Sequence, residues 1–440
     1  MTVSVAGGLR PLSAATAKAI AMESVREAVS FPIIQAEALI ASPTGMIQMI
    51  SEEEARSKIL ETIQRLPTRR IPLTSALDCF GAEDLFARVP LPNFDNSAMD
   101  GYAVVTSSLV RGERLRVVGE QPAGVDRHLP VNPGEAVRIF TGAPIPAGAD
   151  AVVMQEDIIR DRDEIIVNVE VDPGEFVRKR GCDLAEGQKI LMAGERVRVT
   201  TAALLASQGF AEVAVGGEVT AGVVSTGDEL AEPGAKLQPG QIYESNSVLL
   251  AALLRQAGAI VNSVQHCRDD FDSLRDTIKR GARSHILVIS GGVSVGTHDF
   301  VRRALESLGA KIDIWRAAIK PGKPFLFARV SDCVVFGLPG NPVSSFVTFL
   351  RLVRPAIWKM MGAARLEPPK VAAKISVSFK NGDEARPHYV RGKFEDGAFV
   401  PVGRQESHAL FGLSQSNAIL RVPAGGELNR GSDVEVEVWD

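Results

Sequence analysis

Residues 218–358 repeat one pattern, in which a short apolar run is followed by a polar or glycine-rich loop and then by apolar residues at helical spacing. The apolar runs lie at residues 220–224, 259–264, 286–289 and 333–338. The helical patterns lie at residues 246–254, 271–278, 300–308 and 343–353. Short runs rich in β-branched residues are typical of buried strands. The repetition predicts an α/β/α domain with a mainly parallel sheet and helices on both faces.

The regions on either side follow other patterns. Ser51, with Glu54 three residues later, predicts the start of a helix over residues 51–66. A second short helix is expected within residues 73–85. Residues 105–175 carry short alternating runs separated by glycine and proline, which predict an inserted β module. Residues 370–440 alternate again and predict a small β-barrel or sandwich.

These changes of pattern predict four segments. Residues 1–45 are rich in alanine and serine and are expected to be a variable or disordered extension without the features of a secretory signal. Residues 46–217 form the helical and linking region with the β module. Residues 218–367 form the α/β domain, and residues 368–440 form the C-terminal β domain.

Composition narrows the class of protein. The 440 residues carry a net charge of −4, which gives no electrostatic footprint for nucleic acid. The four cysteines never occur as a C-x-x-C pair, so we do not expect a disulfide framework. This use of cysteine instead favours a reducing, cytoplasmic location. No apolar run reaches the length of a membrane span.

Acidic residues gather in the loops that follow the predicted parallel strands. In such sheets ligands bind outside the carboxyl ends of the strands, so these loops should meet at one edge. Like charges repel unless a cation separates them, and Mg²⁺ prefers hard oxygen ligands and phosphates. The pattern predicts a Mg²⁺ and polyanion site there. The acids are Asp228, Glu229, Asp269, Asp270 and Asp299.

Glycines and basic residues complete the predicted anion site. The loop after residues 286–289 offers flexible backbone N–H groups before a helix, an arrangement that favours a phosphate, although a glycine loop can also simply turn the chain. Its residues are Ser290, Gly291, Gly292, Ser294 and Gly296. The segment IKPGKP places Lys320 and Lys323 between the last two strands as partners for an oxyanion.

Three further polar segments lie outside the α/β domain. The loop LPNFDNSAMDGYAV contains Asp100, and its density of polar groups is typical either of a hairpin turn or of a functional loop. Thr141 directly follows a predicted strand. A basic cluster begins at Arg178, beside Asp183, and either is a solvated surface or binds an oxyanion.

Common catalytic motifs are missing from the sequence. It has no G-x-x-x-x-G-K-S/T loop and no H-E-x-x-H pair. The loop GGVSVG also differs from the G-x-G-x-x-G of dinucleotide-binding folds.

Taken together and in this order, the motifs resemble the molybdopterin molybdenumtransferases, which are the MoeA proteins of bacteria and the E-domain of gephyrin. The motifs are PNFDNSAMDGYAV, RIFTGAPIPAGADAVV, VRKRGCD, STGDEL with YESN, SGGVSVGTHD, KPGKP and GLPGNPVSS. The resemblance runs from about residue 46 to the C-terminus. It implies a transferase that inserts molybdate into adenylylated molybdopterin with Mg²⁺-dependent release of AMP. It also implies an elongated homodimer with the active cleft between subunits.

The resemblance carries over individual residues as well. The family's functional set falls on Asp100, Thr141, Asp183, Glu229, Asp269, Asp299, Arg178, Lys320, Pro339, Pro342 and Ser407. Gly340 and Asn341 belong to the same GLPGNPVSS motif and are expected to contact substrate. The family often has a second lysine where this chain has Arg316, so the role of Arg316 stays open.

Roles follow from the chemistry. Asp228, Glu229 and Asp299 are expected to hold the metal, and Arg178 and Lys320 the oxyanion. In the dimer that the resemblance implies, Asp100 is expected to act from across the subunit boundary.

Two other functions stay open. The α/β domain resembles the related molybdopterin adenylyltransferases, but those smaller enzymes lack the DNSAMDGYA loop and the C-terminal β domain. A molybdopterin-binding scaffold is the alternative without turnover. Expected partners are the small-molecule substrates, a second copy of the chain, a molybdopterin adenylyltransferase and recipient molybdoenzymes, with neither nucleic acid nor membrane. The preference between molybdate and tungstate stays open.

Overall fold

A mixed seven-stranded sheet forms the centre of the α/β domain. The computed structural model describes residues 49–292 and 300–439, so the predicted extension over residues 1–45 lies outside the described part. The strands run in the order β1 (Ile50–Ser51), β19 (Lys311–Ala318), β20 (Pro324–Val330), β21 (Cys333–Leu338), β18 (Ile286–Ser290), β14 (Thr220–Thr226) and β17 (Ile260–Cys267). Four of the six pairings are parallel, which confirms the predicted mainly parallel sheet.

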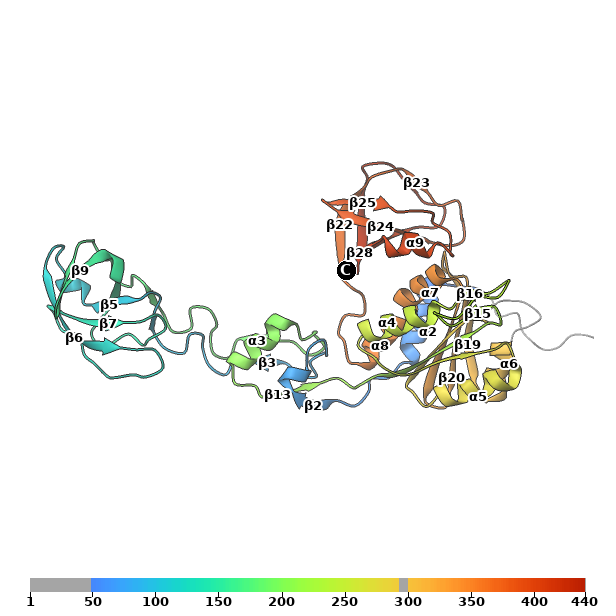
Figure 1. Cartoon of the computed structure of the whole chain (residues 1–440), viewed down its shortest axis with the longest axis horizontal. Coiled ribbons are helices and arrows are strands. Elements are labelled where there is room, and N and C mark those ends of the chain that lie inside the picture. The colour runs from blue at the N-terminus through green and yellow to red at the C-terminus, as the bar shows by residue number, and fades with distance from the viewer. Residues whose placement is uncertain (1–48, 293–299, 440) are drawn as a thin grey trace, which may run out of the picture. The chain divides into compact units, whose positions relative to one another are not determined.

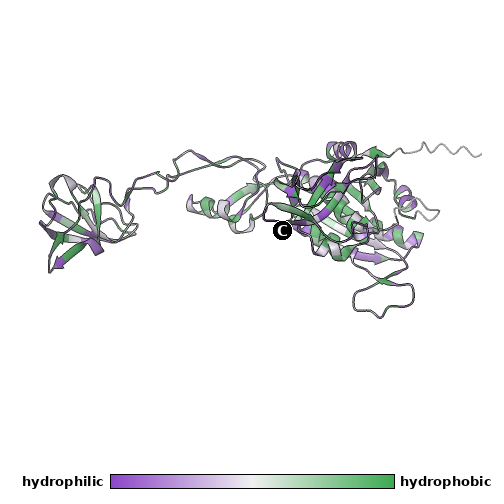
Figure 2. Cartoon of the chain, turned by 90° about the horizontal axis from the view of Figure 1, so that it is seen from above, coloured by the Kyte–Doolittle hydropathy of each residue, from purple (hydrophilic) through white to green (hydrophobic). Residues whose placement is uncertain are grey.

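Helices cover both faces of this sheet (Figure 1). One face packs against α2 (Glu52–Thr62), α4 (Asn246–Gln256), α7 (Pro342–Thr348) and α8 (Arg354–Met360). The other packs against α5 (Phe271–Gly281) and α6 (Phe300–Ser307). Strand β18 is buried on both faces, because Ile286 and Val288 enter the first core while Leu287 and Ile289 enter the second. Figure 2 shows the apolar residues gathered where these helices and strands pack.

Three strands of the sheet were not predicted, namely the two-residue β1 and the longer β19 and β20. Strands β19 and β20 pair antiparallel with each other, and β20 pairs antiparallel with β21. Their sequences, KIDIWRAA and PFLFARV, mix charged and apolar residues without the clean runs of the parallel strands. The loop IKPGKP therefore joins two neighbouring strands. The predicted helix over residues 343–353 is α7 followed by a π-helical turn, η4 (Phe349–Val353), and continues into α8.

The linking region is built from short strand pairs and contains one wrong prediction. Strand β2 (Arg69–Pro72) pairs with β13 (Glu212–Val215), and β3 (Leu85–Phe86) pairs with β12 (Lys189–Leu191) beside α3 (Val199–Ser207). The helix expected within residues 73–85 is only a 3₁₀ turn, η1 (Leu73–Ser75). Backbone bridges at Phe80 and Gly81 to neighbouring segments take the hydrogen bonds that a helix would need.

The predicted β module is a six-stranded sheet. Its order is β8 (Ala151–Met154), β5 (Gly101–Val104), β7 (Glu135–Ile139), β6 (Arg114–Gln121), β10 (Glu164–Val167) and β9 (Ile158–Asp161). Two 3₁₀ turns, η2 (Thr106–Ser108) and η3 (Gln155–Asp157), lie between its strands. A short pair joins β4 (Asn96–Ser97) to β11 (Val177–Arg178). Four of the six strands coincide with the alternating runs of the sequence.

The C-terminal domain is a closed barrel, which settles the choice between barrel and sandwich. Its strands run in the order β22 (Lys370–Ile375), β25 (Ala398–Pro401), β24 (His388–Glu395), β26 (Ala418–Val422) and β28 (Asp433–Val438). Helix α9 (Leu410–Ser414) and the pairs β23 (Phe379–Lys380) with β27 (Glu427–Leu428) and β15 (Leu230–Ala231) with β16 (Ile242–Tyr243) complete the fold. No helix of the described residues has the length and apolar character needed to cross a bilayer.

Candidate active site

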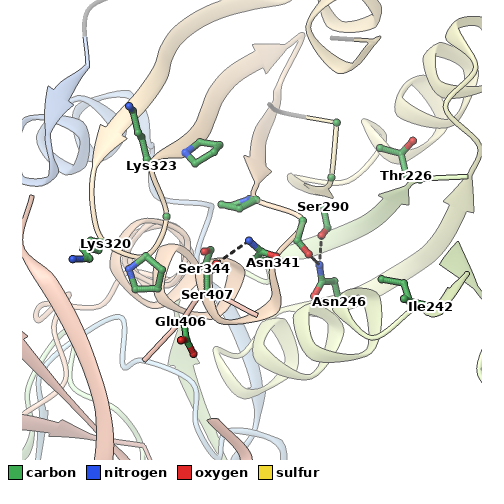
Figure 3. A pocket seen from close by; sticks show the side chains of 18 of the residues that line it. Thr226, Ile242, Asn246, Ser290, Lys320, Lys323, Asn341, Ser344, Glu406 and Ser407 are labelled. Carbon is green, nitrogen blue, oxygen red and sulfur yellow. Dashed lines mark hydrogen bonds between the residues drawn. The ribbon is translucent and has the colours of Figure 1, made fainter. Parts of the chain in front are cut away.

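A cavity of about 940 Å³ opens where the carboxyl ends of the parallel strands meet the barrel (Figure 3). Eleven predicted site residues line it: Glu229, Asp269, Ser290, Gly291, Gly292, Lys320, Lys323, Pro339, Gly340, Asn341 and Ser407. Asp228 and Pro342 are adjacent in sequence to lining residues but are not among them. The predicted residues Ser294, Gly296 and Asp299 lie outside the described residues.

The acidic side of the cavity is formed by the loops after β14 and β17. Thr226, the last residue of β14, donates its hydroxyl to Asp269 Oδ1 at 2.5 Å. The backbone N–H of Asp269 donates to Asp228 Oδ1 at 3.3 Å, which links the two loops. Glu229 folds back over Gly227, where an added Cβ would lie 2.7 Å from its carboxylate. Two strand ends thus bring Glu229 and Asp269 to one cavity, as the sequence predicted.

The glycine loop after β18 is held against β14. Gly291 has a φ of +91°, and a Cβ added there would lie 2.5 Å from the carbonyl oxygen of Thr226. The N–H of Gly291 donates to the carbonyl of Leu338 at 3.3 Å, so the loop also contacts the end of β21. Only glycine fits a left-handed conformation with the neighbouring backbone this close.

Backbone hydrogen bonds join the lysine loop to the barrel. The N–H of Lys320 donates to Pro387 O at 3.0 Å, and the N–H of Tyr389 donates to Lys320 O at 2.7 Å. Nearby, Asn341 Nδ2 donates to Ser407 Oγ at 2.8 Å. The barrel therefore supplies part of the cavity wall, and Ser407 lies beside the GLPGNPVSS motif.

Sequence reasoning missed four barrel residues that line the cavity: Arg386, His388, Gln405 and Glu406. The Arg386 guanidinium is held by Asp383, whose Oδ2 accepts from Nε at 2.8 Å. The sequence signal available for these residues was the segment RPHYVRG, which has polar residues within a barrel strand. Periodicity cannot reveal which end of a strand reaches another domain.

His388 is buried and uncharged at neutral pH. It is 7% exposed, and its ring lies edge-on to Phe379 with centroids 5.4 Å apart. Burial, together with the charges of Lys320 and Arg391, lowers the pKa of His388 to about 4. The cations of this wall, Lys320, Lys323 and Arg386, are therefore accompanied by a neutral imidazole.

Asn246 is a further lining residue that the motifs contained without a role. It is the first residue of α4 and is 9% exposed. Its Nδ2 donates to Ser290 Oγ at 2.8 Å and to Gly340 O at 2.6 Å. One amide thereby connects the end of β18 to the loop after β21.

A second group of predicted residues lies in the linking region and β module. Thr141 donates both its backbone N–H, at 2.7 Å, and its hydroxyl, at 2.8 Å, to Asp100 Oδ1. These bonds hold the pKa of the Asp100 carboxyl below its usual range, with the backbone bond as the largest cause. Two residues 41 positions apart in the sequence thus form one exposed unit.

The basic cluster lies alongside this unit. Arg178 pairs through β11 with Asn96 of the DNSAMDGYA loop. Lys179 Nζ and the N–H of Arg180 both bond to Asp95, at 2.9 and 2.7 Å, so these two groups are already paired. Asp183 is exposed and bonds to Leu91 through its backbone. None of Asp100, Thr141, Arg178 and Asp183 lines the cavity, and neither does Arg316, which lies on β19.

No group of three histidine, cysteine or carboxylate side chains placed to hold a metal ion occurs within residues 49–292 and 300–439. The described acids that line the cavity are Glu229 and Asp269 at the sheet edge, with Asp228 beside them, and Glu406 on the barrel side. Mg²⁺ commonly takes one or two carboxylates and completes its shell with water and substrate phosphates, so this donor set fits such an ion.

Three family models match consecutive parts of the chain. The MoeA N-terminal region (domain I and II) matches residues 50–209, the model named "Probable molybdopterin binding domain" matches residues 222–359, and the MoeA C-terminal region (domain IV) matches residues 373–439. The chain belongs to the MoeA family. The family named in the sequence analysis is thereby confirmed.

Individual relatives agree with the family models over most of the chain. The molybdopterin molybdenumtransferase of Haemophilus influenzae is 37% identical over 403 residues, covering 89% of this chain and 99% of that protein. Molybdopterin molybdenumtransferase 2 of Mycobacterium tuberculosis is 34% identical over 405 residues, covering 89% and 100%. The crystal structure of the molybdopterin biosynthesis moeA protein from Pyrococcus horikoshii has a TM-score of 0.74 at 29% identity, covering 89% and 100%.

Proposed function

We propose that this chain is a molybdopterin molybdenumtransferase, which inserts molybdate into adenylylated molybdopterin and releases AMP, giving molybdenum cofactor. The observation that carries the proposal is the 37% identity to a curated relative of that name over nearly the full length of both chains. The cavity supports it, because it combines carboxylates with three cationic side chains, Lys320, Lys323 and Arg386. That mixture suits an oxyanion substrate next to a metal-bound phosphate.

In this proposal each wall of the cavity has its own task. Asp228, Glu229 and Asp299 hold Mg²⁺, with Asp269 beside them. When bound, Mg²⁺ polarises the phosphoanhydride and offsets the charge that develops on the leaving phosphate. Lys320, Lys323, Arg386 and Ser407 bind molybdate or the terminal phosphate. The loop of Ser290, Gly291, Gly292, Ser294 and Gly296 binds the pterin phosphate through backbone N–H groups, next to Pro339, Gly340, Asn341 and Pro342.

The group around Asp100 completes the site in a homodimer. Asp100, Thr141, Arg178 and Asp183 form an exposed polar surface that lines no part of the cavity of their own chain. A second copy would bring this surface to the cavity, with Arg178 added to the oxyanion site. We place the enzyme in the cytoplasm and expect it to meet a molybdopterin adenylyltransferase and recipient molybdoenzymes.

The test is release of AMP from adenylylated molybdopterin by the purified protein, with and without molybdate, in the presence of Mg²⁺. We expect release that depends on molybdate and falls about a hundredfold or more in Glu229→Gln, because one charged group of the reacting centre is lost. Asp272→Asn, an exposed carboxylate on α5 outside the cavity, serves as the matched control and should retain activity.

Two results would contradict the proposal. Tight pterin binding without AMP release would indicate a scaffold. Transfer of AMP from ATP to free molybdopterin would indicate an adenylyltransferase, which acts one step earlier.

A further inference from the structure

The amide of Asn246 has a fixed orientation. Its Nδ2 lies 2.6 Å from the carbonyl oxygen of Gly340, which can only accept a hydrogen bond. The nitrogen must therefore face Gly340 and Ser290, as Figure 3 shows for Ser290. The position of the amide oxygen follows from this constraint.

That oxygen is buried and without a partner. Asn246 is 9% exposed, and within the described residues no donor reaches Oδ1. Most buried polar atoms in native proteins are hydrogen-bonded, and leaving one unpaired costs stability. Asn246 itself lines the cavity, and its unpaired acceptor is accounted for if binding of a ligand there supplies the missing donor.

The chemistry of the oxygen restricts which part of a substrate it can meet. Ionised phosphate and molybdate present only acceptor oxygens, so an amide oxygen repels them. The cavity has other groups for those anions, namely Lys320, Lys323 and Arg386. The partner of Oδ1 must be an N–H or O–H group in the organic part of the substrate.

We infer that Asn246 is a substrate-binding residue whose Oδ1 accepts a hydrogen bond from an N–H of the pterin ring, while Nδ2 holds the Ser290 and Gly340 loops. Two such donors, the ring N3–H and the 2-amino group, are common to oxidised pterins and to the reduced ring of the substrate. Asn246 lies within residues 222–359, which match the model named for molybdopterin binding. The inference rests on the proposed function and adds to it a residue that selects the ring.

The experiment compares three fluorescent probes on the full-length protein. The parent is 6-hydroxymethylpterin monophosphate. Its lumazine counterpart replaces the 2-amino group by oxygen, and its N3-methyl counterpart blocks the ring N–H. Wild type should bind the parent about tenfold more tightly than one of the two counterparts, since one hydrogen bond in a buried site is at stake.

Substitutions then assign the discrimination to Asn246. Asn246→Leu keeps the approximate size and removes the acceptor, so it should bind the parent and the disfavoured counterpart equally. Asn246→Ala gives the same comparison if the leucine variant does not fold. Ser290→Ala removes one partner of Nδ2 but leaves Oδ1, so affinity can fall while the discrimination remains. A purely structural role for Asn246 would lower the affinity for all probes alike.

The contrary results are distinct from one another. Equal binding of all three probes by wild type overturns this inference and leaves the proposed function standing. Discrimination that persists in both Asn246 variants has the same two consequences. Weaker binding of 2′-deoxy- or 3′-deoxy-AMP than of AMP, abolished in Asn246→Leu, would assign the oxygen to a ribose hydroxyl instead. Failure to bind any pterin phosphate overturns both the inference and the proposed function.

Discussion

Burial of a single histidine should make the stability of the protein depend on pH. The pKa of His388 is about 4 in the folded chain against 6.5 for an unperturbed histidine. Between these values the unfolded state binds more protons, so the free energy of unfolding rises with pH from about 4 to 6.5. The neutral, buried His388 therefore contributes at most about 3 kcal/mol to the free energy of unfolding. This contribution is fully present above pH 6.5 and is lost as the pH falls toward 4.

Urea unfolding of wild type and His388→Gln between pH 4.5 and 7.5 measures this contribution. The variant should lose most of the slope over that range. His128→Gln changes an exposed histidine, with 86% of its side chain accessible, and should keep the wild-type slope. Equal slopes in wild type and His388→Gln would contradict the assignment.

Gly291 is expected to tolerate no side chain. In Gly291→Ala the new methyl group would meet the carbonyl of Thr226 at 2.5 Å in a left-handed conformation. We expect a loss of about 2 kcal/mol or more in the free energy of unfolding, together with weaker binding of phosphate ligands. Gly309→Ala is the matched control, because Gly309 also has a positive φ, of +74°, but nothing lies within 4 Å of an added Cβ. Its cost should be about 1 kcal/mol, and equal costs would exclude the steric explanation.

The attachment of helix α2 depends on one buried carboxylate. Glu52 is 3% exposed and accepts from the Tyr389 hydroxyl at 2.5 and 2.6 Å and from Arg351 Nε at 2.8 Å. Burial and the nearby Glu52 carboxylate raise the pKa of Tyr389, so the phenol stays protonated and acts as a donor. The network joins α2, the η4 turn and barrel strand β24.

Removing the Glu52 charge should therefore be costly. Glu52→Gln leaves Arg351 buried without this charge partner, and we expect about 3 kcal/mol of destabilisation in chemical denaturation. Glu53→Gln is the neighbouring control, because Glu53 is 68% exposed where it pairs with Arg421 and should cost less than about 1 kcal/mol. A similar cost for both variants would show that burial is not the cause.

Assembly of the site from two copies can be tested by complementation. Asp100→Ala and Lys320→Ala change the two separate groups of predicted site residues, and each variant alone should be inactive. If the cleft is shared between subunits, half of the dimers formed on co-expression are mixed and each has one intact cleft. AMP release should then recover to about a quarter of the wild-type rate. No recovery would mean that each cleft is built from one chain or that the chain does not form such a dimer.

Local sequence was sufficient for most of the elements. The parallel strands, the seven-residue to eleven-residue helices around them and four strands of the β module each have a periodic pattern that depends only on which face is buried. Sequence order also brought Glu229 and Asp269 to one sheet edge, because parallel strands align their carboxyl ends. The grouping of Ser290, Gly291 and Gly292 with the GLPGNPVSS loop has the same origin.

Pairing and packing between segments determined the elements and cavity residues that the local pattern did not predict. The segment within residues 73–85 has helical composition but gives its hydrogen bonds to other segments. Strand β19 pairs with β20, and β20 pairs with β21. Arg386 and His388 reach the cavity because Lys320 bonds to Pro387 and Tyr389. The bridges at Phe80 and Gly81 and the bonds of Lys320 join residues more than 60 positions apart, and no local period records them. The sequence by itself thus determined the elements and the acidic edge, whereas the barrel wall of the cavity and the free oxygen of Asn246 arise only from tertiary contacts.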